Sequence, residues 1–159
     1  MPNWIEGTLK LRGKRENIRN FIKNEITASE LYGVKSDINE QVIDDSGDDH
    51  LDFTFNDEPW IEGTRRAFIT NKYLWMEEDY GVAVLSIKQA WSFNSNDGDL
   101  DRWKEIARDY DIDIKLYGIE CGVQFCHEII ITEKGSRVVE NVIQYENWDW
   151  ECPFPNMGG

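Results

Sequence analysis

Apolar and polar side chains alternate along residues 3–12, where Ile5 and Leu9 fall on one side of the chain and charged side chains on the other. This period of two predicts a half-buried strand. Over residues 16–26 the apolar positions recur instead at the spacing of an amphipathic helix. The chain therefore opens with a strand, a turn at Gly13 and a helix whose other face is basic.

The same two periods recur along the rest of the chain. Alternating and β-branched runs predict strands at 51–55, 64–70, 82–91, 112–116 and 123–132, and helical spacing predicts a helix at 100–110. Residues 137–146 fit a strand or a helix, and the turn before them favours a strand that closes a β-hairpin. This order predicts an α+β fold, with two amphipathic helices on one face of a mainly antiparallel sheet.

The length of 159 residues suits a single domain over residues 1–159. Seven Trp, seven Phe and six Tyr supply enough apolar surface for a packed core. One short repeat is present, because Trp4–Thr8 and Trp60–Thr64 both read WIEGT. Two similar entry strands, a shared turn geometry or coincidence would each explain this repeat.

The formal net charge is −14, and it is unevenly distributed. Residues 1–26 carry six basic and three acidic side chains, whereas residues 37–58 carry nine acidic side chains and no Lys or Arg. We therefore expect an acidic insertion at about residues 30–58. The bulk charge disfavours binding to duplex DNA or to an anionic membrane, because both surfaces repel a polyanion.

The acidic insertion suggests a protein partner. Its carboxylates could mimic a nucleic-acid backbone and occupy the basic groove of a host protein. The residues that would do so are Asp44, Asp45, Asp48 and Asp49. Alternatively, the insertion is a solvated loop that contributes only solubility.

No signal peptide opens the chain and no apolar run reaches bilayer length, so we expect a soluble, cytoplasmic protein. The expected role of Cys121, Cys126 and Cys152 is apolar packing, because an odd number of cysteines fits a reducing compartment. Their spacing does not match a structural zinc site, and Asp97–Asp101 and Asp109–Asp113 lack the pattern of a calcium loop. We therefore expect no metal and no cofactor.

Residue patterns typical of catalysis are absent from the sequence. The histidines His50 and His127 have no nucleophile elbow or recognisable cysteine partner, and no glycine-rich phosphate loop occurs. Carboxylate pairs suited to hydrolysis arise by chance in a chain this acidic, so they carry little evidence. We expect a binding protein, and a hydrolase is the less favoured interpretation.

Arginines and aromatic residues gather in the region after Pro59. Arg forks match phosphate oxygens, and Trp and Tyr rings stack on bases. This composition predicts a nucleotide site formed by Trp60, Arg65, Arg66, Trp75, Tyr80 and Trp91. The alternative is that the tryptophans belong to the core and that the arginines pair with local carboxylates.

Basic side chains near the start of the chain offer a second surface for phosphate or for an acidic partner. They are Lys10, Arg12, Lys14, Arg15, Arg19 and Lys23. A solvated helix face would have the same composition.

Several segments resemble the YubB-type ferredoxin-like family of phage and plasmid proteins. They are Met1–Trp4 with its strand, Ala90–Ser92 before a helix, Ile112–Tyr117 and Glu120–Phe125. The chain departs from the family at Phe93–Asn94, where prolines are common, and near Cys126–His127, where a glycine is usual. The resemblance implies a ferredoxin-like core and an origin in a mobile element, in a bacterial host cell. It implies no catalytic residues.

These observations predict a non-catalytic accessory protein of phage type that counteracts a bacterial defence system by sequestering a signalling nucleotide. The alternative is an acidic nucleic-acid mimic that inhibits a host defence protein directly. Both functions are binding functions, and neither decides whether the protein forms a homo-oligomer.

Overall fold

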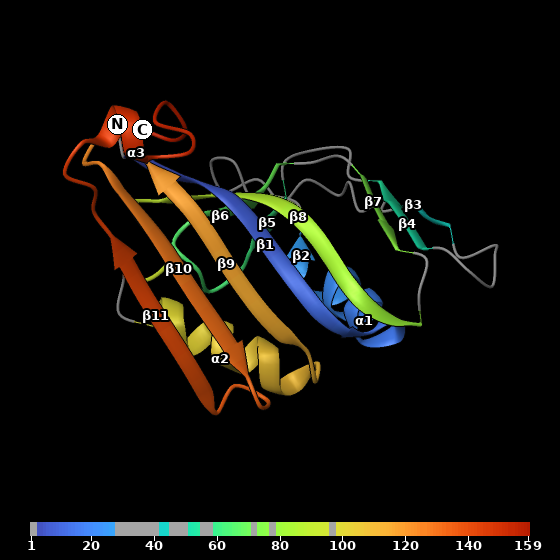
Figure 1. Cartoon of the computed structure of the whole chain (residues 1–159). Coiled ribbons are helices and arrows are strands. Elements are labelled where there is room, and N and C mark those ends of the chain that lie inside the picture. Colours follow the sequence, from blue (N-terminus) through green and yellow to red (C-terminus); the bar gives the residue numbers. More distant parts are fainter. Residues whose placement is uncertain are drawn as a thin grey trace.

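The computed structural model describes residues 3–27, 42–44, 51–54, 59–70, 73–76, 79–95 and 98–159. Within these residues, eight strands form one antiparallel sheet in the order β11-β10-β9-β1-β8-β6-β5-β2 (Figure 1). Their bounds are β1 Trp4–Lys14, β2 Ile26–Thr27, β5 Trp60–Ile61, β6 Ala67–Ile69, β8 Tyr80–Ala90, β9 Asp113–Glu120, β10 Phe125–Thr132 and β11 Arg137–Ile143. A second sheet has the order β3-β4-β7, with β3 at Val42–Asp44, β4 at Leu51–Thr54 and β7 at Tyr73–Met76.

Strand β1 lies at the centre of the large sheet because both of its edges are paired. Leu9 is opposite Leu85 of β8 on one side and opposite Leu116 of β9 on the other. These three leucines are fully buried, as the alternation of apolar residues along β1 predicts. The register therefore sends one side chain of every two on β1 into the core and the other onto the opposite face.

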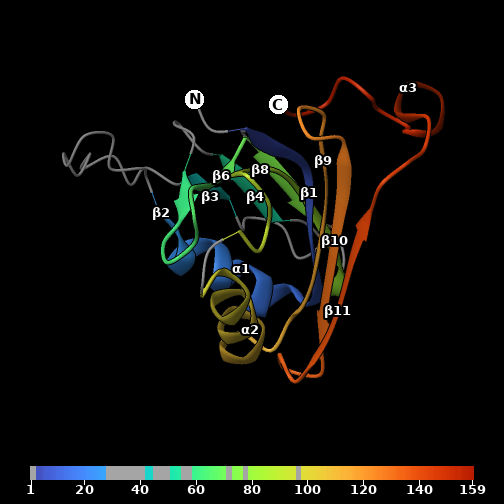
Figure 2. The ribbon, with the colours of Figure 1, turned by 90° about the vertical axis from the view of Figure 1, so that its left-hand side faces the viewer.

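Helices α1 (Arg15–Glu25) and α2 (Asp99–Asp109) cover the same face of the sheet (Figure 2). Ile18 and Phe21 of α1 and Trp103 of α2 are fully buried against the alternate residues of the strands. We call the other side of the sheet the open face. Burial of these apolar stripes is the main stabilising contribution to the fold.

A short helix, α3 (Trp148–Glu151), lies across the sheet from α1 and α2 (Figure 2). Trp148 and Cys152 pack there with Ile119 of β9 and Cys126 of β10 in a second apolar cluster. The C-terminal segment therefore covers one end of the open face. None of the helices in the described ranges is long and apolar enough to cross a membrane.

The sequence predicted most of the long elements correctly. The opening strand and helix, the helix near residues 100–110 and the closing β10-β11 hairpin are all present, and residues 137–143 form a strand. The strand expected at 64–70 is shortened to β6, because Thr64 closes a turn that begins at Ile61: its N–H and its hydroxyl both donate to the Ile61 carbonyl, at 3.3 and 2.6 Å. The two-residue strands and α3 were not predicted. Most of the expected acidic insertion lies outside the described residues.

Candidate ligand-binding site

A hollow of about 600 Å³ lies at the start of α1. Its lining residues are Lys14, Arg15, Glu16, Arg19, Asp79 and Tyr80, and we call it the α1 hollow. The pairing of β1 with β8 forms its base, because Lys14 at the end of β1 is directly opposite Tyr80 at the start of β8. The volume lies within the range of small-molecule sites, about 300–1,000 Å³.

The first turn of α1 presents backbone donors at this hollow. Lys14 occupies the N-cap position and makes no side-chain capping hydrogen bond, and the Arg15 N–H donates to the Asp79 carbonyl at 2.7 Å. The amides that follow Arg15 in the first turn have no partner within the helix, since the first four N–H groups of any helix lack one. An anion is the usual ligand for such a helix terminus.

Three cations stand at this same end of α1. Lys14 is exposed, whereas Arg15 and Arg19 are half-buried and each interacts with a neighbouring group. Cations at a helix N-terminus oppose the helix dipole, which costs about 0.3–1 kcal/mol each when the site is solvated. Glu16 and Asp79 offset part of this charge. The arrangement favours an additional anion, which would compensate both the cations and the dipole.

Tyr80 supplies an aromatic surface at the edge of the hollow. Its side chain is 60% exposed, although it lies at the first position of a long strand. An exposed tyrosine ring next to cations is a surface on which a base can stack. Among the predicted nucleotide-site residues whose side chains are described, Tyr80 alone lines the hollow.

Arg65 and Trp91 are brought together at the opposite end of β8. The Arg65 guanidinium carbon lies 5.9 Å from the centre of the Trp91 ring, and both side chains are exposed. The backbone of Arg65 is held by the buried Asp99, whose carboxylate accepts from the Arg65 N–H at 2.8 Å and from Gln89 Nε2 at 3.1 Å. Arg65 and Trp91 therefore form a cation-π contact in which the backbone of Arg65 is held in place by Asp99.

Trp60 belongs to an aromatic row on the open face that the sequence did not reveal. It is directly opposite Phe68 in the β5-β6 pair, and Phe68 contacts Trp4 with ring centres 5.9 Å apart. Lys88 Nζ lies 5.7 Å from the centre of the Phe68 ring and 5.9 Å from that of Trp4. The WIEGT repeat was the available signal, because it places Trp4 and Trp60 at its first position.

Among the predicted residues whose side chains the structure describes, Tyr80 lies far from Arg65 and Trp91. Tyr80 and Trp91 flank the two ends of β8, which separates them by roughly 35 Å at 3.3 Å per residue. Arg66 is exposed in the turn before β6, with φ 56°. Tyr80 therefore lies apart from Arg65 and Trp91, because a long strand runs between them, which sequence proximity does not show.

Two groups of predicted residues fall where the structure gives no side-chain description. The backbone of Trp75 lies in β7 of the small sheet. Asp44 is the last residue of β3, and Asp45, Asp48 and Asp49 lie outside the described residues. The acidic partner surface stays a prediction.

Cys126 and His127 point to opposite faces of β10, as expected for neighbours on a strand. Cys126 packs in the α3 cluster, where burial raises the pKa of its thiol. His127 is buried on the other side, with Nε2 2.8 Å from Glu140 Oε1 and its ring stacked on Phe93. These contacts show the packing role that was expected for Cys126.

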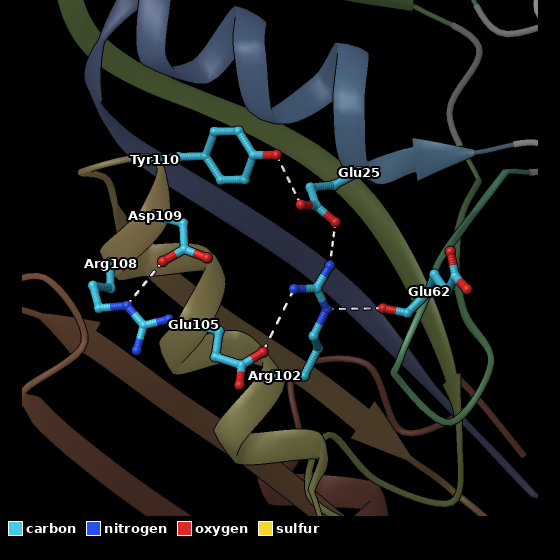
Figure 3. Close-up of polar contacts among 7 residues, drawn as sticks. All are labelled: Glu25, Glu62, Arg102, Glu105, Arg108, Asp109 and Tyr110. Atoms are coloured by element: carbon cyan, nitrogen blue, oxygen red, sulfur yellow. Dashed lines mark hydrogen bonds and ion pairs between the residues drawn. The ribbon is translucent and has the colours of Figure 1, made fainter.

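A polar cluster around Arg102 joins α1, α2 and the turn after β5 (Figure 3). Arg102 Nε donates to the Glu62 carbonyl at 3.0 Å, and its guanidinium pairs with Glu25 and with Glu105. Tyr110 donates to Glu25 Oε1 at 2.7 Å, and burial together with this hydrogen bond raises the pKa of Tyr110 to about 12. Because the groups satisfy one another, this cluster is a structural tie between elements.

Comparison of the chain with protein-family models, with curated proteins and with solved structures finds no match.

Proposed function

We propose that this protein is a non-catalytic accessory protein of phage type that sequesters a signalling nucleotide and so counteracts a bacterial defence system. The α1 hollow is the proposed binding site. The observation that carries the proposal is the meeting of Lys14, Arg15 and Arg19 with an uncapped helix N-terminus and the exposed ring of Tyr80. Cations and helix amides suit a phosphate, and the ring suits a base.

We further propose a ferredoxin-like core of the YubB type, and the order of the central elements supports the ferredoxin-like part of this proposal. Strand β1 lies between β8 and β9, and α2 connects these two parallel neighbours of β1 on one side of the sheet. Helix α1 likewise leads from β1 to β2, beyond β6 and β5. A ferredoxin-like fold also has two helical crossovers on one face of an antiparallel sheet, although here the first crossover passes three strands, β8, β6 and β5. Fold alone assigns no activity, so the function rests on the hollow.

In the proposed complex, the phosphate group of the nucleotide binds at the first turn of α1, and the base of the nucleotide stacks on Tyr80. Charge-assisted hydrogen bonds from Arg15 and Arg19 would hold the phosphate oxygens, and base stacking contributes about 1–3 kcal/mol per base. The described lining residues include no Ser, Cys or His, the usual nucleophiles and bases of hydrolysis, and their carboxylates, Glu16 and Asp79, lie among the cations of the hollow. This composition supports retention of the ligand over its conversion.

Calorimetry with a panel of linear and cyclic nucleotides tests the proposal. We expect at least one nucleotide to bind, and we expect Arg19→Gln to weaken its binding about tenfold or more, since a charge-assisted contact contributes about 1.5–3 kcal/mol. Tyr80→Ala should also weaken binding, whereas Tyr80→Phe should retain it. Arg108→Gln is the matched control, because it removes the same charge from an exposed position on α2.

Two results would contradict this assignment. If no nucleotide in the panel binds, the sequestration function is wrong. If a nucleotide binds and the loss of affinity follows Arg65→Gln and Trp91→Ala rather than Arg19→Gln, the site is the Arg65–Trp91 pair at the other end of β8. In bacteria that carry a nucleotide-signalled defence system, protection by the expressed protein should be lost with the same variants that lose binding.

A further inference from the structure

The central strand of the open face carries a regular row of cations. Lys10, Arg12 and Lys14 occupy every second position of β1, and all three are exposed on the side away from α1 and α2. Alternate residues of a strand are separated by about 6.6 Å. This spacing is comparable to that of successive phosphates in an extended nucleic-acid strand. We call these three residues the cation row.

Each member of the cation row has an apolar neighbour on β8. Val84 is directly opposite Lys10, Val82 is opposite Arg12, and Tyr80 is opposite Lys14. The three apolar side chains are 46%, 54% and 60% exposed, respectively, which is unusual for three successive positions on one strand face. The open face therefore presents a column of charge beside a column of apolar surface.

The cations of the row differ in how far they are neutralised. Arg12 forms an ion pair with Asp113 of β9, with Nε 2.9 Å from the carboxylate. Lys115, which is opposite Lys10 on β9, pairs with Glu128 at 2.7 Å. Among the described residues, neither Lys10 nor Lys14 has an ion-pair partner. Two exposed positive charges thus remain available in a chain whose net charge is −14.

The cation row is continuous with the α1 hollow, because Lys14 belongs to both and Tyr80, directly opposite Lys14 on β8, also lines the hollow. At the other end of the sheet, the α3 segment covers part of the open face (Figure 2). Trp148 packs there with Ile119 of β9 and Cys126 of β10. A ligand that entered the hollow could therefore extend along β1 and β8 past the pairs Lys14–Tyr80, Arg12–Val82 and Lys10–Val84.

Resting on the proposed function, we propose that the ligand is a short single-stranded oligonucleotide. Its terminal phosphate binds in the α1 hollow, the following phosphates lie along the cation row, and the bases or sugars contact the β8 column. An acidic peptide is a poorer match. It does not carry a row of anionic groups with a parallel row of rings beside it, as an oligonucleotide does with its phosphates and bases. A duplex is disfavoured, because many of its phosphates would come close to the acidic side chains of the rest of the protein and would be repelled by them.

The test measures affinity against ligand length, with 5′-phosphorylated thymidine mono-, di-, tri- and tetranucleotides. We expect affinity to rise up to the trinucleotide or tetranucleotide and then to level off. Lys10→Gln should weaken binding of the trinucleotide severalfold and leave the mononucleotide unchanged, whereas Arg19→Gln should weaken both. Lys104→Gln, an exposed lysine on α2, is the matched control and should change neither.

Salt dependence gives a second measurement. Each phosphate contact to a single strand should add about 0.7 to the slope of log affinity against log salt concentration, so the trinucleotide slope should be the steeper and Lys10→Gln should reduce it. A polyglutamate peptide of equal charge should compete poorly with the trinucleotide.

The outcomes separate the two proposals. Equal affinity for all lengths, no effect of Lys10→Gln, or full competition by polyglutamate would overturn the oligonucleotide inference while mononucleotide binding at the hollow still stood. If no nucleotide of the linear and cyclic panel binds and Arg19→Gln changes nothing for any length, the proposed function itself is wrong. Tight binding of a short duplex would also contradict the inference.

Discussion

At the scale of single residues, Gly7 and Gly63, the two glycines of the WIEGT repeat, are required for different reasons. A Cβ on Gly7 would lie 1.9 Å from the Tyr117 carbonyl oxygen, where β1 and β9 approach closely. Gly63 instead adopts φ +84° in the turn after β5, and a Cβ there would contact the Arg102 side chain. The same residue type thus allows a close strand pairing at Gly7 and a left-handed turn at Gly63. This difference favours coincidence, rather than two similar entry strands, as the origin of the WIEGT repeat.

We expect Gly7→Ala to be strongly destabilising. The added methyl group would meet backbone atoms of β9, which cannot move without breaking the ladder, so the loss should reach about 1–3 kcal/mol or more. Gly98→Ala is the comparison, because its Cβ would have open space and only the positive φ would be costly, at about 1–2 kcal/mol. Urea unfolding monitored by tryptophan fluorescence measures both. Equal effects would show that β1 and β9 can separate there.

At the scale of elements, the helices are joined to each other and to the sheet through Arg102. This side chain connects α2 to the end of α1 through Glu25 and to the turn after β5 through the Glu62 carbonyl (Figure 3). The exposed fractions of the Arg102 and Glu25 side chains are 22% and 17%. Removal of Arg102 would leave a partly buried carboxylate without its main partner, which is the costly half of such a pair.

Arg102→Gln should therefore lower the free energy of unfolding by about 1–3 kcal/mol, less than for a fully buried pair because of the remaining solvent contact. Arg108→Gln provides the matched control. Its ion pair with Asp109 is more than half exposed on both sides, so its loss should leave the free energy of unfolding almost unchanged. Thermal unfolding compares the two variants. Similar losses would mean that the Arg102 cluster does not hold the helices together.

At the scale of the whole molecule, the charge on the open face contrasts with that of the chain. Thirty-one acidic side chains repel one another in the folded state, whereas Lys10 and Lys14 stand where they can bind an anion. Salt should therefore act in opposite directions on the stability of the fold and on the affinity for an anionic ligand. It screens the repulsion within the fold, and it also screens attraction between the cation row and a ligand.

We expect the thermal unfolding temperature of the free protein to rise as sodium chloride is increased from low ionic strength, while nucleotide affinity falls over the same range. A variant with Glu146→Gln and Asp149→Asn, both exposed positions, should show a smaller rise because less repulsion remains to be screened. Scanning calorimetry and titration calorimetry give the two values. A fall in unfolding temperature with salt would show that attractive ion pairs dominate the fold.

The local pattern of the chain by itself determined its long elements. Alternation along β1, helical spacing in α1 and α2, and β-branched residues in β11 each report which faces are apolar, and burial of those faces is what an element requires. The basic residues of the α1 hollow were visible in the same way, because Lys14, Arg15 and Arg19 are close together in the chain. The distribution of charged residues along the sequence likewise showed that residues 37–58 carry nine acidic side chains and no Lys or Arg.

Only the tertiary structure decided which of these residues meet. The sequence grouped Tyr80 with Trp91, but β8 holds them at opposite ends, and the β1-β8 register places Tyr80 against Lys14 instead. The position of Trp60 beside Phe68 and the tie from Arg102 to Glu25 also depend on pairings between distant segments. Periodicity reports only the environment of one element, whereas strand order and register follow from packing the whole core, and these positioned both the hollow and the cation row.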